Sequence, residues 1–218
     1  MKAIPNEHTC PHTGKLKGLY AITDERLIAE ENFSQTVEAA LQGGASIIQY
    51  RDKSSDQNKR LQQASTLNTL CKKYQALCII NDDIELARTV NANGVHLGKD
   101  DALIAQARQT LGTEAIIGIS CYNDLDLAIA AEQNSADYVA FGAMFSSSTK
   151  PEASDASLTL ISEAKQKLSI PVCAIGGITD KNIDQLIRHE IDMTAVINSL
   201  FSAADIKDAA TRLSRHFD

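Results

Sequence analysis

The sequence lacks the features that mark several classes of protein. No apolar run approaches the roughly 20 residues that a membrane-spanning helix needs. The start of the chain is polar, so we expect no secretory signal there. Acidic residues outnumber basic ones, and the net charge of −7 argues against general nucleic-acid binding. An anionic small molecule is still compatible with this composition, because the charge close to a site decides what binds there.

Cysteine is scarce and irregularly spaced. The chain has five cysteines, an odd number, which favours reduced thiols in a cytoplasmic protein over a disulfide framework. One of them, Cys10, lies between His8 and His12, but this spacing matches no strong zinc pattern. Residues 1–17 show no periodicity, and we interpret them as an extension outside the folded core.

The sequence does contain an alternation of short apolar runs with helical patterns, repeated eight times. Runs that are apolar throughout are typical of parallel strands covered on both faces. The segments between them carry apolar residues at helical spacing. The pattern predicts an α/β protein with one domain, a (β/α)8 TIM barrel over residues 18–218. A doubly wound open sheet is the alternative, but nothing marks the break in strand order that it requires. The predicted strands are Leu19–Thr23, Ser46–Arg51, Leu77–Asn81, Gly94–Leu97, Ile116–Ser120, Tyr138–Gly142, Val172–Gly176 and Thr194–Ile197.

Three polar side chains alternate where the second predicted strand ends. Gln49, Arg51 and Lys53 point to one side if the strand period of two continues. In a barrel, functional residues collect at the carboxyl ends of the strands, so this arrangement indicates a site for an anion. A solvated strand end is the simpler alternative, because charged residues lie mostly on the surface.

Acidic residues follow the third and fourth predicted strands. Asp82 and Asp101 are able to share one Mg²⁺ ion, which takes one or two carboxylates together with water and substrate phosphate. The alternative is helix capping, by Asp82 or Asp83 for one helix and by Asp100 or Asp101 for the next. The position of both acidic pairs at the same rim as the cations favours a metal site.

A second phosphate site is indicated after the last two strands. Gly176 and Gly177 follow the seventh strand, and the short segment Asn198–Phe201 follows the eighth. Loops at these two positions form a recurrent phosphate site in barrels. A tight turn that needs positive φ is the alternative explanation for the glycines. The long irregular stretch Ala143–Ser157 is rich in hydroxyls and contains Lys150. A loop of this length in a compact domain is usually either functional or disordered.

Seven motifs in register give the chain a specific resemblance over roughly residues 18–215. It resembles the thiamine phosphate synthase family, whose members are barrel enzymes of thiamine biosynthesis. The motifs lie at Leu19–Asp24, Gln49–Lys53, Ile80–Asp83, Gly94–Asp101, Gly118–Ser120, Ser148–Lys150 and Ala174–Thr179. The chain departs from the family pattern at Lys99, Ser146, Met193 and Asn198.

The resemblance implies a reaction and a set of residues. The pyrimidine pyrophosphate would ionise to a pyrimidine methyl cation, which the nitrogen of a carboxylated thiazole phosphate attacks with loss of CO₂. The residues that would hold the pyrimidine and its pyrophosphate are Gln49, Arg51, Lys53, Asn81, Ser120 and Lys150. Mg²⁺ would be bound by Asp82 and Asp101, and the thiazole phosphate would be surrounded by Ser147, Thr149, Gly177, Ile197 and Asn198.

The residues themselves agree with a dissociative reaction, which needs the charge of the leaving group neutralised and no protein nucleophile. We recognise no nucleophile–base pair in the sequence, and we interpret His96 as a structural or supporting residue. Two rival functions are a thiazole tautomerase-like relative and a non-catalytic thiamine phosphate binding protein. The intact set of cations and acids argues against both, because neither needs a pyrophosphate site.

Overall fold

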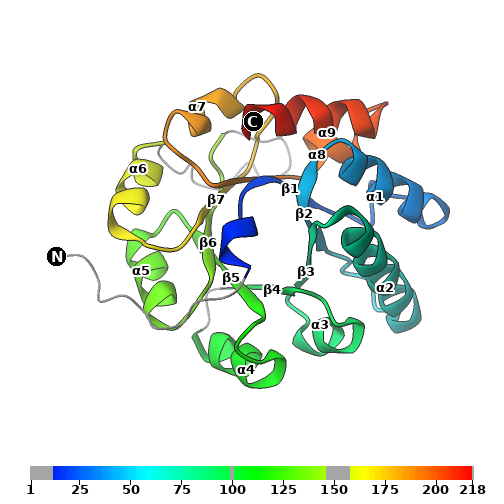
Figure 1. Ribbon diagram of the computed structural model, residues 1–218, viewed down its shortest axis with the longest axis horizontal. Helices are drawn as coiled ribbons and strands as arrows, with labels where there is room; N and C mark the ends of the chain where they lie inside the picture. The colour runs from blue at the N-terminus through cyan, green and yellow to red at the C-terminus, as the bar shows by residue number, and fades with distance from the viewer. Residues whose placement is uncertain (1–11, 99–100, 146–157, 218) are drawn as a thin grey trace.

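The chain folds into a closed barrel of eight parallel strands in sequential order, surrounded by helices (Figure 1). The computed structural model describes residues 12–98, 101–145 and 158–217. Each strand pairs with the next along the chain, and β8 closes the barrel by pairing with β1. The predicted (β/α)8 barrel is confirmed, and the open sheet is excluded.

The elements alternate as the apolar pattern predicts. The strands are β1 (Gly18–Ile22), β2 (Ala45–Tyr50), β3 (Leu77–Asn81), β4 (Gly94–Leu97), β5 (Ile116–Tyr122), β6 (Tyr138–Phe141), β7 (Val172–Ile175) and β8 (Met193–Val196). The helices are α1 (Phe33–Gln42), α2 (Gln57–Tyr74), α3 (Ile84–Val90), α4 (Asp101–Leu111), α5 (Leu125–Gln133), α6 (Leu158–Lys167), α7 (Ile183–Ile187), α8 (Asn198–Phe201) and α9 (Ile206–Ser214). Short 3₁₀ turns are η1 (Thr13–Lys15), η2 (Glu30–Asn32) and η3 (Arg215–Phe217).

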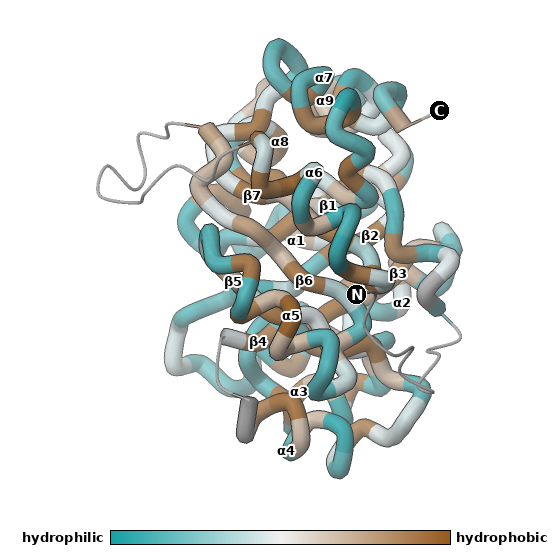
Figure 2. The backbone as a smooth tube through the Cα atoms, turned by 90° about the vertical axis from the view of Figure 1, so that its left-hand side faces the viewer, coloured by the Kyte–Doolittle hydropathy of each residue, from teal (hydrophilic) through white to brown (hydrophobic). Residues whose placement is uncertain are grey.

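Both faces of the strands are buried, in two separate layers. Along β1, Leu19 and Ala21 pack outward against the helices, while Tyr20 and Ile22 pack inside the barrel. This alternation explains why each strand is apolar throughout instead of amphipathic. In Figure 2 the strands form a mostly apolar centre and the most hydrophilic segments lie on the helices and loops around it.

The amino-terminal end of the barrel is closed by the segment before β1. Leu16 is buried among the inward-facing side chains, and η1 lies across this end of the barrel (Figure 1). Met193 pairs in register with Gly18, so β8 begins one residue earlier than predicted. Met193 therefore packs at the end of the barrel opposite to the strand termini that carry the predicted site.

Two further findings bear on the expectations from composition. No helix in the described part of the chain is long and apolar enough to cross a membrane. The cysteines at positions 71, 78, 121 and 173 are free and buried. Cys10 and the two histidines near it in sequence fall largely outside the described residues.

Candidate functional site

The three predicted anion-binding side chains after β2 occupy different environments. Gln49 is buried inside the barrel, where its Nε2 donates to Tyr20 Oη at 2.8 Å. Arg51 follows the strand, and its main chain is joined to the Thr23 hydroxyl by hydrogen bonds of 2.9 and 3.2 Å. Lys53 lies further out, and its side chain is 51% exposed. The alternation thus places the amide inside the barrel and the two cations at its rim.

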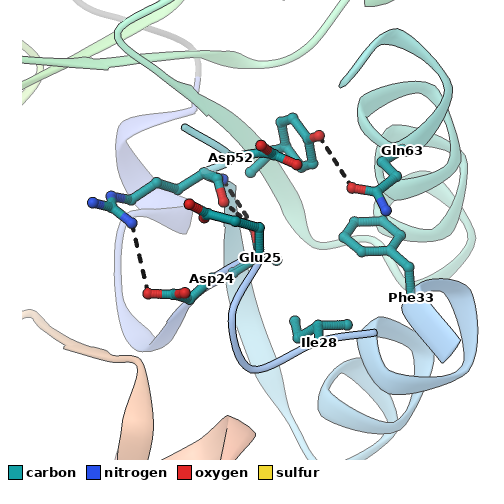
Figure 3. A pocket seen from close by; sticks show the side chains of 9 residues that line it. Asp24, Glu25, Ile28, Phe33, Asp52 and Gln63 are labelled. Carbon is teal, nitrogen blue, oxygen red and sulfur yellow. Dashed lines mark hydrogen bonds and ion pairs between the residues drawn. The ribbon is translucent and has the colours of Figure 1, made fainter. Parts of the chain in front are cut away.

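An acidic residue after β1 lies beside Arg51. Nη1 of Arg51 is 3.7 Å from Oδ2 of Asp24, which also accepts a hydrogen bond of 2.6 Å from Arg26. The bond from Arg26 is the main cause of the lowered pKa of the Asp24 carboxyl. Asp24 and Arg51 line a cavity of about 10 Å³. Figure 3 shows this cavity with Asp24 labelled. That volume has room for only about one water molecule, so a substrate would have to meet Arg51 from the rim.

Lys53 reaches across to the end of β3. Its Nζ lies 2.7 Å from Oδ2 of Asp82, and Asn81 Nδ2 donates to the same oxygen at 2.8 Å. Asp82 has a left-handed backbone with φ 60°, and its N–H donates to the carbonyl oxygen of His96 at 2.9 Å. Such a conformation is uncommon for a residue with a side chain and recurs at functional sites. The turn after β3 therefore presents a carboxylate directly to a cation in the segment after β2.

The acidic side chains at this rim would supply only some of the ligands that Mg²⁺ needs. The side chain of Asp82 is 54% exposed, so its carboxylate is open to a ligand. Asp101 is the first residue of α4, and its side chain lies outside the described residues. Among the described residues, no cluster of three or more His, Cys, Asp or Glu side chains is arranged to hold a metal ion. A hard cation here would need water and substrate phosphate to complete its shell, which is how Mg²⁺ is commonly bound.

Two other acids near the rim have structural contacts. Asp83 is the N-cap of α3, accepts a hydrogen bond from Leu86 N at 2.9 Å, and pairs with Arg60 at 2.6 Å. Asp52 is buried and lies 2.8 Å from Lys59 Nζ. The capping alternative therefore holds for Asp83, whereas Asp82 has a different partner.

The first residues after β6 lie against the two glycines after β7. Gly176 and Gly177 have φ of 107° and 64°, and Phe145 N donates to the carbonyl of Gly176 at 3.1 Å. A Cβ on Gly177 would lie 2.6 Å from the Phe145 carbonyl oxygen. The tight-turn explanation for the glycines is thus met by the structure, and it is compatible with a phosphate site. Ile197 packs against the barrel interior, and Asn198 begins α8.

Inside the barrel, Ser120 of β5 is bonded to His96 of β4. Ser120 Oγ and His96 Nε2 are 2.8 Å apart, a hydroxyl–imidazole pair that the sequence did not reveal. Burial lowers the pKa of His96 to about 4, so the imidazole is neutral at pH 7. Its Nδ1 meets the Tyr138 hydroxyl at 2.9 Å, where a hydrolase would place a carboxylate to stabilise the imidazolium. The pair is therefore not arranged to activate a nucleophile.

Two tyrosines of the barrel interior were given no role by sequence reasoning. Tyr20 and Tyr138 are fully buried, and their hydroxyls are 2.8 Å apart. Burial raises the pKa of both phenols, so they stay protonated. The sequence signal that could have found them is a tyrosine at an inward position of an otherwise apolar strand.

Several predicted residues lie outside the described part of the chain. They are Ser147, Thr149 and Lys150 in the loop after β6, together with the departures at Lys99 and Ser146. A larger cavity of about 290 Å³ lies between α8, α9 and the loop after β7, lined by residues that include Lys181, Ser199 and Arg212. Gly177 and Asn198 do not line it, but Ser199 of the predicted phosphate segment does, so the cavity adjoins that site.

The chain is similar over most of its length to known proteins. A family model described as thiamine monophosphate synthase matches residues 19–200. A thiamine-phosphate synthase of Nitrosococcus oceani is 52% identical over 205 residues, which cover 94% of this chain and 94% of that protein. Another, from Thioalkalivibrio sulfidiphilus, is 49% identical over 204 residues, covering 94% and 97%.

Solved structures agree with these matches. A thiamine phosphate pyrophosphorylase from Pyrococcus furiosus has a TM-score of 0.84 and 35% identity, covering 94% of this chain and 96% of that one. A 3-hexulose-6-phosphate synthase has a TM-score of 0.69 at 16% identity, covering 92% and 100%. At that identity the second likeness shows only a shared barrel fold.

Proposed function

The chain belongs to the thiamine monophosphate synthase family and is therefore a transferase, and we propose that it makes thiamine phosphate. In this reaction a hydroxymethylpyrimidine pyrophosphate and a carboxylated thiazole phosphate combine, and pyrophosphate and CO₂ are released. The observation that carries the proposal is the convergence of Arg51, Lys53 and Asp82 at one rim, where Lys53 and Asp82 are 2.7 Å apart. A cationic group beside a metal-competent carboxylate suits a pyrophosphate leaving group.

The chemical step we propose is dissociative. The C–O bond to pyrophosphate breaks first and leaves a pyrimidine methyl cation, and the thiazole nitrogen then forms the new C–N bond. Arg51 and Lys53 would stabilise the negative charge that develops on the leaving group, and Lys150 is assigned to the same task by family resemblance. Gln49, Asn81 and Ser120 would hold the pyrimidine. This division of roles needs no protein nucleophile, in keeping with the neutral, poorly basic His96.

Mg²⁺ fits the proposal as a cofactor held by Asp82 and Asp101 and completed by the substrate. When bound, it would neutralise charge on the pyrophosphate as that group leaves. Lys53 would then move from the carboxylate toward the phosphate oxygens, because a metal ion and an ammonium group compete for the same oxygen of Asp82.

The thiazole phosphate would bind at the other side of the rim. We assign it to Gly177, Ile197 and Asn198, with Ser147 and Thr149 from the loop after β6. The glycine provides backbone that a phosphate can approach closely. Asn198 is able to donate through its amide, so its replacement of the more usual serine preserves a donor.

The experiment that tests the function is a joint assay of pyrophosphate release and thiamine phosphate formation by the purified protein. Turnover should require both substrates and a divalent metal. Conversion of the thiazole phosphate without pyrophosphate release would instead identify a tautomerase. Tight binding of thiamine phosphate without turnover of either substrate would identify a binding protein. We place the reaction in the cytoplasm, a choice supported by the free, buried thiols.

A further inference from the structure

Five side chains from five strands form one continuous hydrogen-bonded chain across the barrel interior. Its successive donor–acceptor distances are 2.8, 2.8, 2.9 and 2.8 Å. In order, the members are Gln49 on β2, Tyr20 on β1, Tyr138 on β6, His96 on β4 and Ser120 on β5. The two ends are residues assigned above to the pyrimidine, while the three middle residues have no assigned contact with any substrate.

The middle of the chain is held rigidly by packing. The rings of His96 and Tyr138 are stacked, with centroids 5.6 Å apart, and Tyr20 meets Tyr138 edge-on at 6.1 Å. Gly118 leaves the space that the Tyr138 ring occupies, because a Cβ at that position would lie 2.0 Å from Cζ and 2.4 Å from the hydroxyl oxygen. A cluster this closely fitted leaves the hydroxyls little freedom to find other partners.

With the amide nitrogen of Gln49 facing Tyr20, as in the structure, the hydrogen-bonded chain has one favourable direction of donation. The Gln49 amide nitrogen donates to Tyr20, whose own proton is then available to Tyr138. If Tyr138 donated to Tyr20 instead, the Tyr20 proton would have no acceptor in the chain, and burying an unmet donor costs about 1–3 kcal/mol. Tyr138 therefore donates to His96 Nδ1, which leaves the imidazole proton on Nε2 to donate to Ser120.

The direction determines what each end offers to a ligand. At one end the amide nitrogen of Gln49 is occupied, so the amide oxygen is left as an acceptor. At the other end Ser120 accepts from His96, so its own proton is left to be donated. An aminopyrimidine presents the complementary pattern, an amino donor and ring-nitrogen acceptors. A pyrimidinone presents the reverse, a carbonyl acceptor and a ring N–H donor.

We propose that Tyr20, Tyr138 and His96 are positioning residues that lock Gln49 as an acceptor and Ser120 as a donor, so that the site selects an aminopyrimidine over the corresponding pyrimidinone. This inference rests on the proposed function for the identity of the ligand. The fixed direction of these hydrogen bonds is a property of the free protein. A site built to pair with specific polar groups rejects an analogue that leaves them unpaired, because the buried partners lose their hydrogen bonds.

The test compares Tyr138→Phe with a matched control, Tyr50→Phe. Both substitutions delete one buried phenol hydroxyl. The Tyr50 hydroxyl, however, donates to Gln63 Oε1 at 3.1 Å and takes no part in the hydrogen-bonded chain of five side chains. The first readout is the ¹⁵N NMR signature of the His96 tautomer in the free protein. The second is the ratio of kcat/KM for the aminopyrimidine pyrophosphate to that for its 4-oxo analogue.

The wild type and Tyr50→Phe should show His96 as the Nε2–H tautomer, and Tyr138→Phe should show a mixture. The selectivity ratio should fall by about 10-fold or more in Tyr138→Phe, with the KM for thiazole phosphate unchanged. If Tyr138→Phe does not fold, Tyr20→Phe takes its place, with the same expected loss of selectivity.

An Nδ1–H tautomer in the wild type, or an unchanged selectivity ratio in the folded variant, would overturn this proposal while leaving the proposed function intact. Absence of turnover with either pyrimidine in the wild type would overturn the proposed function and the selection together. The NMR result distinguishes failure of this proposal from failure of the proposed function, because it reports the tautomer of His96 in the absence of substrate.

Discussion

At the scale of single residues, two adjacent aspartates after β3 have different contacts because the backbone turns between them. Asp82 takes φ 60° and directs its carboxylate to Lys53, whereas Asp83 is extended and caps α3. Of these two identical side chains, that of Asp82 is therefore a candidate for function, whereas that of Asp83 has a structural role.

This difference predicts unequal effects of two matched substitutions. Asp82→Asn should lower kcat by on the order of 10²-fold or more, the loss typical of one preorganised electrostatic contact. Asp83→Asn keeps a good N-cap and should leave kcat within a few-fold of the wild type. EDTA should abolish turnover of the wild type. Full activity in Asp82→Asn, or in the absence of divalent metal, would remove the basis for the magnesium site.

The inner wall of the barrel makes a residue-scale prediction about stability. Gly118→Ala would place a Cβ 2.0 Å from Tyr138 Cζ, so the substitution should lower the free energy of unfolding by about 1–3 kcal/mol or more. Gly14→Ala is the control, because no atom lies within 4 Å of its added Cβ. Urea unfolding of the two variants measures the difference, and equal stabilities would show that the Tyr138 ring is loosely held.

At the scale of elements, residues 142–145 after β6 and residues 176–177 after β7 lie against each other. Each continues directly from a strand, and Met144 N and Phe145 N donate to the carbonyls of Ile175 and Gly176 at 3.1 Å each. We therefore expect a change in one segment to displace the other, together with a phosphate bound against them.

Gly177→Val tests this coupling. The branched side chain would strain a backbone at φ 64° and collide with Phe145. The backbone that we assign to the thiazole phosphate should therefore shift away from its position in the wild type. The KM for thiazole phosphate should rise much more than the KM for the pyrimidine pyrophosphate. Gly142→Ala is the control, since its Cβ would meet only Ile175 Cγ2, at 3.8 Å. A larger rise for the pyrimidine substrate would mean that the two anion sites are assigned the wrong way round.

At the scale of the whole molecule, ligands that bind only the folded barrel raise its stability by mass action. A metal site completed by phosphate predicts that Mg²⁺ and pyrophosphate stabilise the protein together more than the sum of their separate effects. At 100 times the Kd of a ligand the gain in the free energy of unfolding is about 2.7 kcal/mol, which corresponds to about 5–11 °C in Tm for a chain of this size. Scanning calorimetry with each ligand alone and with both ligands together measures these shifts in Tm. Strictly additive shifts would contradict a shared site.

The sequence by itself determined the alternation of strands and helices, and eight repeats of that alternation predicted the barrel that the structure shows. These features depend on short-range patterns, apolar runs and helical spacing, that one stretch of chain carries alone. Only the tertiary structure decided that Asp83 caps a helix while Asp82 meets Lys53, and that Ser120 bonds to His96. It also joined Tyr20 to Tyr138, 118 residues apart in the chain. Such contacts depend on barrel closure and strand register, which set where an inward side chain ends relative to one from a distant strand.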